Sequence, residues 1–109
     1  IAVSSGNSFV HETESQVILN GSYNINFTMD LVLKDTGLFD DLAKKLNASL
    51  EISPKIVEIF KDGQKRYGSR AWSSMIVKRM EDLNKIDFRA DGFPEELVDN
   101  ELEEKGYEI

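Results

Sequence analysis

The longest run of helical periodicity lies between about Asn26 or Thr28 and Leu46. Apolar residues recur in it at steps of three, four and seven: Leu31, Val32, Leu38, Phe39, Leu42, Ala43 and Leu46. This spacing places them on one wide face of an α-helix, and we expect that face to be buried. Gly37 interrupts the helix at a cost of about 1 kcal/mol relative to alanine. Either this cost is tolerated, or another element packs closely against the backbone there.

Two further helices have clear boundary signals. One runs from about Phe9 to Leu19, with Ser8 suited to its N-cap. The other begins at Ser53 as N-cap, with Pro54 at the first helical position. Gly68 is expected to end that helix, because glycine readily adopts the left-handed backbone conformation at helix ends.

A fourth helix is predicted from about Arg70 to Leu83, with Ser69 as its cap. We interpret its large apolar residues as core rather than as cofactor contacts: Trp72, Met75 and Met80. Strand signals are poor throughout and the connections are short. The sequence therefore predicts an all-α fold, a small helical bundle.

The pattern weakens after Ile86. A loop is expected from Asp87 to Pro94, followed by a short acidic helix from Pro94 to Glu104. We therefore divide the chain into a helical domain, residues 1–86, and an acidic C-terminal extension, residues 87–109.

The net charge of −7 lies in the C-terminal part of the chain. From Glu81 onward there are eleven acids and three bases, whereas the preceding residues are close to neutral. The sequence lacks the basic surface that nucleic-acid binding requires, so nucleic acid is excluded as a partner. The acidic extension is either a solvated terminus or a segment that binds a basic partner.

Several kinds of site are excluded by composition. The chain has no cysteine and one histidine, His11, which excludes disulfides, thiolate nucleophiles and multi-histidine metal sites. Its seven glycines are too far apart for a dinucleotide or phosphate loop. No apolar stretch approaches the roughly 20 residues that span a bilayer, so we expect no membrane partner and a cytoplasmic protein. The chain begins without Met, and we interpret Ile1 as a position inside a longer protein.

Lys34 is the residue whose position is hardest to explain by packing. It shares one helical face with Phe27, Leu31 and Leu38. A lysine on an apolar face extends its ammonium group to water, finds an anion, or points into a cleft. Spacing alone leaves these alternatives open.

The segment around Lys34 resembles a signature of the 3-hydroxyacid dehydrogenase family, which includes 3-hydroxyisobutyrate dehydrogenase and tartronate semialdehyde reductase. It has an aromatic residue, an apolar helix and then Lys-Asp, as in Asn26-Phe27-Thr28-Met29-Asp30-Leu31-Val32-Leu33-Lys34-Asp35-Thr36-Gly37-Leu38. Other segments are similar to the family's pattern: Ser4-Ser5-Gly6-Asn7-Ser8, Leu50 to Pro54, and Tyr67-Gly68 with Trp72-Ser73-Ser74. The sequence departs from the pattern at Thr36-Gly37, where Leu or Met is usual, and at Ala71, where Asp is frequent.

The resemblance implies that this chain is the C-terminal domain of an NAD(P)-dependent dehydrogenase that acts on a small 3-hydroxy acid. In such enzymes an N-terminal Rossmann domain binds NAD or NADP, and a lysine with Asn four residues later acts on the substrate. No such Lys/Asn pair and no glycine fingerprint occur here, so we expect both to precede Ile1 and the isolated chain to be inactive.

The resemblance also implies roles for three residues of this chain. Lys34 is expected to reach the nicotinamide end of the cofactor, Phe27 to pack nearby, and Asp35 to orient Lys34 or to pair with a surface cation. A homodimer or homotetramer is expected. The alternative is a non-enzymatic helical module that binds a partner through its acidic extension.

Overall fold

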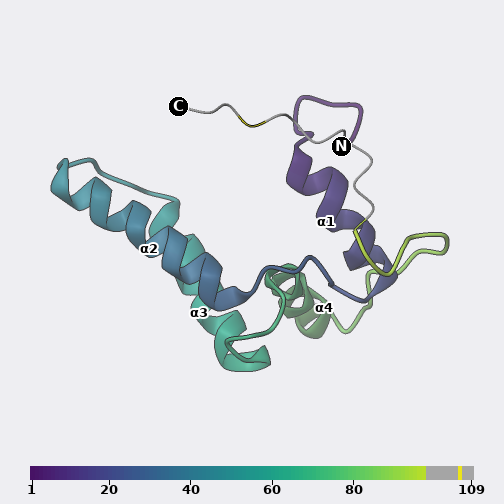
Figure 1. Cartoon of the computed structure of the whole chain (residues 1–109). Helices are drawn as coiled ribbons and strands as arrows, with labels where there is room; N and C mark the ends of the chain where they lie inside the picture. Colours follow the sequence, from purple (N-terminus) through teal and green to yellow (C-terminus); the bar gives the residue numbers. More distant parts are fainter. Residues whose placement is uncertain (98–105, 107–109) are drawn as a thin grey trace.

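The computed structural model describes residues 1–97 and residue 106. Within them the chain forms helices and no strand, so the predicted all-α fold is confirmed (Figure 1). The elements in chain order are α1 (Phe9–Asn20), α2 (Met29–Lys45), α3 (Ser53–Tyr67), the 3₁₀ helix η1 (Ser73–Val77) and α4 (Lys78–Asn84).

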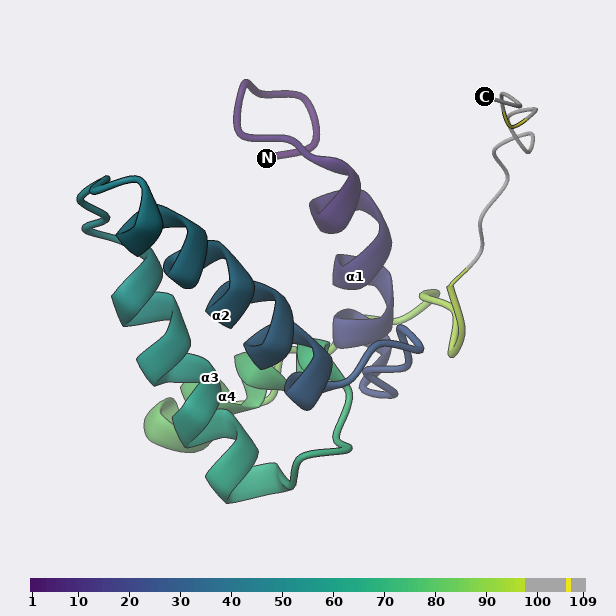
Figure 2. The same cartoon turned by 60° about the vertical axis from the view of Figure 1, so that its left-hand side comes forward.

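The helices α2 and α3 form an antiparallel hairpin, and α1 stands apart from it (Figures 1 and 2). The short helix η1 lies between these two parts, since it contacts both α1 and α3. α4 continues directly from η1. None of the helices in the part of the chain that the structure describes has the length and apolar character needed to cross a membrane.

The boundaries of α1 agree with the sequence prediction. The Ser8 hydroxyl accepts a hydrogen bond from the His11 N–H at 3.0 Å, as an N-cap residue does. Gly21 ends the helix with a φ of 91°, and its N–H donates to the Val17 carbonyl at 3.0 Å. A residue with a side chain is strained in that conformation, which is why glycine stands there.

The apolar face of α2 is less buried than the periodicity predicts. Met29 and Ala43 are buried on the side that α3 covers. By contrast, the residues Leu38, Leu42 and Leu46 are 64%, 54% and 69% exposed. The prediction that the whole stripe is buried is therefore wrong for this chain, because the stripe is wider than one neighbouring helix can cover.

The start of α3 differs from the prediction by one residue. Ile52 occupies the N-cap position, and Ser53 is the first helical residue. The Ser53 hydroxyl donates to Asp40 of α2 at 2.5 Å, so it joins the two helices instead of capping α3. Pro54 lies in the first turn, and Gly68 ends the helix with a φ of 97°, both as predicted.

The predicted fourth helix is wrong at its start. Residues 69–72 are not helical, and the chain forms η1 from Ser73 before α4 begins at Lys78. Thr28 and Trp72 form an isolated antiparallel bridge, which holds the chain in an extended conformation at a position where its apolar spacing suits a helix. Ser69 is therefore not the N-cap of a helix, contrary to the prediction.

The structure also decides between the two alternatives for Gly37. A Cβ added there would meet no described atom within 4 Å, so the cost of this glycine is tolerated and no described element packs closely against its backbone. The close approach is instead at Gly63 of α3, where a Cβ would lie 2.7 Å from Ile76 Cδ1 and 3.2 Å from Met29 Sδ. Of the residues expected in the core, Met80 is 49% exposed.

The segment after α4 folds back over the end of α1. This segment, residues 87–97, is called the strap below. The Ala90 N–H donates to the Leu19 carbonyl at 3.1 Å, and the Asn20 side-chain amide donates to the Phe93 carbonyl at 2.9 Å. The predicted loop is present, and residues 94–97 are not helical. The rest of the predicted acidic helix, up to Glu104, lies outside the described residues.

A buried polar cluster joins the strap to α4 and to the α1–α2 linker. Glu81 is 2% exposed and accepts hydrogen bonds from Tyr23 Oη at 2.5 Å, Arg89 Nη1 at 2.7 Å and the Phe88 N–H at 3.0 Å. Burial raises the pKa of Glu81, but these donors outweigh it, so the pKa lies below its ordinary value. Burial and the bond to Glu81 raise the pKa of Tyr23 to about 12.

Candidate functional site

Lys34 lies on the exposed surface of α2. Its side chain is 61% exposed, and Nζ lies 3.0 Å from Asp35 Oδ1. The structure thus brings together two of the three residues predicted to bind the cofactor. An exposed ion pair of this kind contributes little to stability, about 0–1 kcal/mol. The ammonium group is therefore accessible, and a ligand that reaches this face encounters it without first displacing a buried partner.

Phe27 lies just before α2, and its backbone is fixed by contacts with the start of η1 and the residue before it. Its carbonyl accepts a hydrogen bond from the Ser73 N–H at 2.8 Å, and Thr28, the next residue, forms the bridge with Trp72. Phe27 as a whole residue is 37% exposed. The ring is therefore available for contact while its backbone is held in place.

The N-terminus of α2 is not a free anion site. Helix N-termini bind phosphates through unpaired backbone N–H groups. Here the Met29 N–H donates to the Ala71 carbonyl at 2.9 Å, and the Asp30 N–H donates to the Ser69 carbonyl at 3.1 Å. These groups already have partners within the chain. Any positive charge offered to a ligand on this face must therefore come from side chains.

Asp30 and Arg70 form an ion pair at the N-terminal end of α2. The Asp30 carboxylate accepts from the buried Thr28 hydroxyl and from Arg70 Nη1, the latter at 3.2 Å. The Thr28 hydroxyl and, to a lesser extent, Arg70 hold the pKa of Asp30 below its ordinary value. This carboxylate therefore stays ionised at neutral pH and keeps Arg70 at the N-terminal end of α2.

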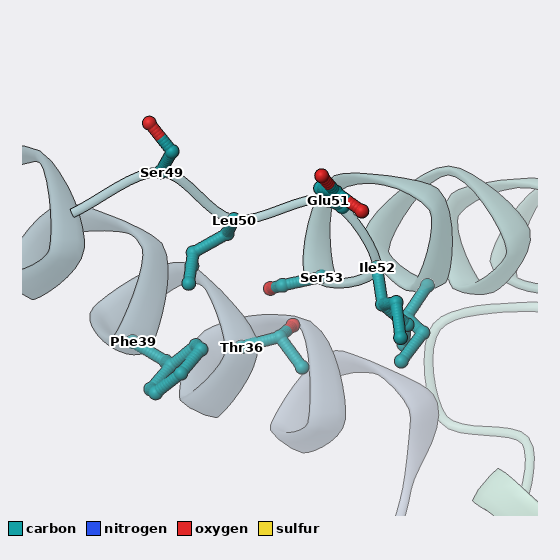
Figure 3. Close-up of a pocket in the computed structure, with 8 residues that line it drawn as sticks. Thr36, Phe39, Ser49, Leu50, Glu51, Ile52 and Ser53 are labelled. Carbon is teal, nitrogen blue, oxygen red and sulfur yellow. The ribbon is translucent and has the colours of Figure 1, made fainter.

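An apolar groove lies at the other end of the hairpin, between α2 and the start of α3 (Figure 3). It has a volume of about 500 Å³. Figure 3 shows Thr36 and Phe39 of α2 on one side and the segment from Ser49 to Ser53 on the other. Glu51 is the charged residue among its lining, so the groove offers no cation to a phosphate. It suits an apolar group rather than a dinucleotide.

The sequence analysis missed a polar cavity beside Phe27. This cavity, called the Trp72 cavity below, has a volume of about 490 Å³. It is lined by Asn24, Ile25, Asn26, Trp72, Glu96 and Leu97. Its lining comes from three segments far apart in the chain, so no local motif predicts it. Among the described residues there is also no group of three or more His, Cys, Asp or Glu side chains that suits a metal ion.

Comparison with known proteins gives one match. Residues 1–80 match the family model described as the NAD-binding domain of NADP-dependent 3-hydroxyisobutyrate dehydrogenase. A search of curated proteins and a search of solved structures gave no significant match. The matched residues include all of α1, α2, α3 and η1, and with them Phe27, Lys34 and Asp35. The chain therefore belongs to the family of NAD-binding domains of 3-hydroxyisobutyrate dehydrogenases.

Proposed function

We propose that this chain is the helical C-terminal domain of an NAD(P)-dependent 3-hydroxyacid dehydrogenase, and that α2 lies against the nicotinamide end of the cofactor. The observation that carries the proposal is the position of Lys34 within the family match. Its ammonium group is exposed on α2 and paired with Asp35 at 3.0 Å.

The residues on this face suit a dinucleotide. Lys34 donates charge-assisted hydrogen bonds to ribose, carboxamide or phosphate oxygens, which are stronger than bonds between neutral groups. Phe27 offers a partly exposed ring to the planar nicotinamide, and its backbone is fixed by Ser73. Asp35 holds the ammonium group in place before the cofactor binds. The bound nicotinamide supplies the hydride-accepting ring.

The remaining catalytic parts belong to the longer protein in this proposal. A Rossmann domain binds most of NAD or NADP, and a lysine with Asn four residues later acts on the hydroxyl of a small 3-hydroxy acid. The present chain supplies no catalytic residue and has no turnover by itself. The division into a domain at 1–86 and an extension at 87–109 belongs to the same proposal.

We further propose that the enzyme is a cytoplasmic homo-oligomer. Support comes from the face of α2 that α3 leaves uncovered, where Leu38, Leu42 and Leu46 are more than half exposed. A row of leucines with this exposure is typical of a surface that is buried by another protein chain. The dehydrogenase and the oligomer are separate proposals, because either can hold without the other.

The test is steady-state kinetics of the full-length protein with a panel of 3-hydroxy acids, following reduction of NAD and NADP. Lys34→Ala is expected to raise the KM for the cofactor about tenfold, because a charged hydrogen bond contributes about 1.5 kcal/mol or more. The matched control is Lys44→Ala. Lys44 lies on the same helix, is 76% exposed and pairs with Asp41 at 3.3 Å.

Three outcomes are distinguishable. A rise in the cofactor KM for Lys34→Ala but not for Lys44→Ala supports the proposed site. Turnover that is the same in both variants and the wild type keeps the dehydrogenase and removes Lys34 from its cofactor site. Absence of both turnover and cofactor binding in the full-length protein overturns the proposed function.

A further inference from the structure

The Trp72 cavity is built from segments that the fold holds firmly together. Asn24, Ile25 and Asn26 come from the α1–α2 linker, and Trp72 precedes η1. These two segments are joined by the bridge between Thr28 and Trp72. Its volume of about 490 Å³ lies within the range of about 300–1,000 Å³ that is usual for small-molecule sites.

The third wall of the cavity is the strap. The Ser22 hydroxyl donates to the Glu95 carbonyl at 2.6 Å, and this contact sets the position of the next two residues, Glu96 and Leu97. Arg89 anchors the same segment through its ion pair with Glu81 at 2.7 Å. Since the family match ends at residue 80, this wall lies outside the part of the chain that the family model covers.

The charge and chemistry of the lining select the ligand. Among the residues that the structure describes, Glu96 is the one ionisable residue that lines the cavity, and no Lys or Arg lines it. A carboxylate or phosphate ligand would meet a like charge there. An organic cation would meet a carboxylate and the ring of Trp72, which is the best aromatic partner for a cation. The two asparagine side chains add hydrogen-bond donors and acceptors for a nearby hydroxyl or amine.

We propose that the Trp72 cavity is a binding site for a small organic ammonium ion, with Glu96 and Trp72 as its recognition residues. The strap positions Glu96, and Asn24 and Asn26 contact a polar substituent of the ligand. This site is independent of the proposed dehydrogenase function, because it uses neither Lys34 nor Asp35.

The test uses the intrinsic fluorescence of the 109-residue chain, which contains one tryptophan. Trp72 emission is recorded during titration with choline chloride, with potassium chloride as the ionic-strength control. The neutral probe is 3,3-dimethylbutan-1-ol, which has nearly the shape of choline without its charge. Choline is expected to change the emission saturably and to bind about five- to tenfold more tightly than the alcohol.

Two variants separate this site from non-specific attraction to an acidic protein. Glu96→Gln removes the charge from the cavity and is expected to weaken choline binding about fivefold. Glu95→Gln is the matched control: it also removes one negative charge, but its side chain does not line the cavity and its carbonyl still accepts from Ser22.

Equal affinity for choline and the alcohol would overturn the proposal, as would equal weakening by the two variants. Saturable binding of glycerol in the absence of choline binding would also overturn it, because the cavity would then be a polyol site. No saturable change with any probe would show that the cavity does not bind ligands of this size.

Discussion

Tyr23 and Glu81 are hydrogen-bonded partners although they are 58 residues apart, with Oη 2.5 Å from Oε2. Arg89 contacts both of them: Nη1 lies 2.7 Å from Glu81 and Nη2 lies 2.9 Å from the Tyr23 hydroxyl. The guanidinium also lies 5.2 Å from the centre of the Tyr23 ring. These three residues connect the α1–α2 linker, α4 and the strap through one carboxylate.

Removal of that carboxylate is expected to destabilise the fold strongly. Glu81→Ala leaves the Tyr23 hydroxyl and the Arg89 guanidinium without their main partner. Breaking a buried ion pair costs about 3–5 kcal/mol, and we expect about 2–4 kcal/mol here because the Arg89 side chain is 36% exposed. The free energy of unfolding in urea measures this loss.

The control for this variant is Glu58→Ala. Glu58 pairs with Lys55 at 2.9 Å, but its side chain is 70% exposed. Its loss is expected to cost less than about 1 kcal/mol. Equal destabilisation by the two variants would contradict a special role for the buried cluster.

The same cluster predicts that stability falls at both ends of the pH range. The pKa of Glu81 is lowered from 4.5, so its contribution is complete above pH 4.5 and is lost as pH falls through the lower folded value. The pKa of Tyr23 is raised from 10 to about 12, so its contribution is complete below pH 10 and is lost as pH rises toward 12. Thermal unfolding of the wild type and Glu81→Gln at a series of pH values tests this. If the stability of Glu81→Gln falls as steeply toward low pH as that of the wild type, the loss of stability in acid does not come from Glu81.

The helices could be predicted because their signals are local. The bounds of α1 follow from Ser8 and Gly21, which are adjacent to the helix they limit. The helix predicted from Arg70 fails because Trp72 pairs with Thr28, more than forty residues away, and that pairing overrides the local apolar spacing. The exposed leucines of α2 show a different limit: periodicity identifies an apolar face but not which element covers it.

The candidate sites also include residues whose proximity is local in the sequence and residues that only the fold brings together. Lys34 and Asp35 are neighbours on one helix, so their proximity follows from the sequence alone. The Glu81 cluster and the Trp72 cavity depend on the strap folding back over α1. No spacing rule connects Arg89 to Tyr23 or Glu96 to Trp72, because their proximity arises from the path of the chain.

Gly63 and Gly37 provide a matched test of helix packing. Gly63→Ala places a methyl group 2.7 Å from Ile76 Cδ1, and such overpacking costs about 1–3 kcal/mol, more than the gain in helix propensity. Gly37→Ala meets no atom within 4 Å and is expected to stabilise the protein by up to about 1 kcal/mol. Urea unfolding measures the free energy of unfolding of both variants, which should fall for Gly63→Ala and rise for Gly37→Ala. A stabilised Gly63→Ala would mean that Ile76 moves aside at little cost.

The exposed leucines of α2 predict self-association. If Leu38, Leu42 and Leu46 are buried between two copies of the chain, each buried leucine contributes about 1.5–3 kcal/mol. A charge at the central position should then prevent association, so we expect Leu42→Glu to sediment as a monomer under conditions where the wild type is larger. The control is Leu83→Glu on α4, since Leu83 is 63% exposed but lies outside this row. Sedimentation velocity over a range of concentrations makes the comparison, with circular dichroism to confirm that both variants are folded. A wild-type chain that stays monomeric throughout would refute self-association through this face.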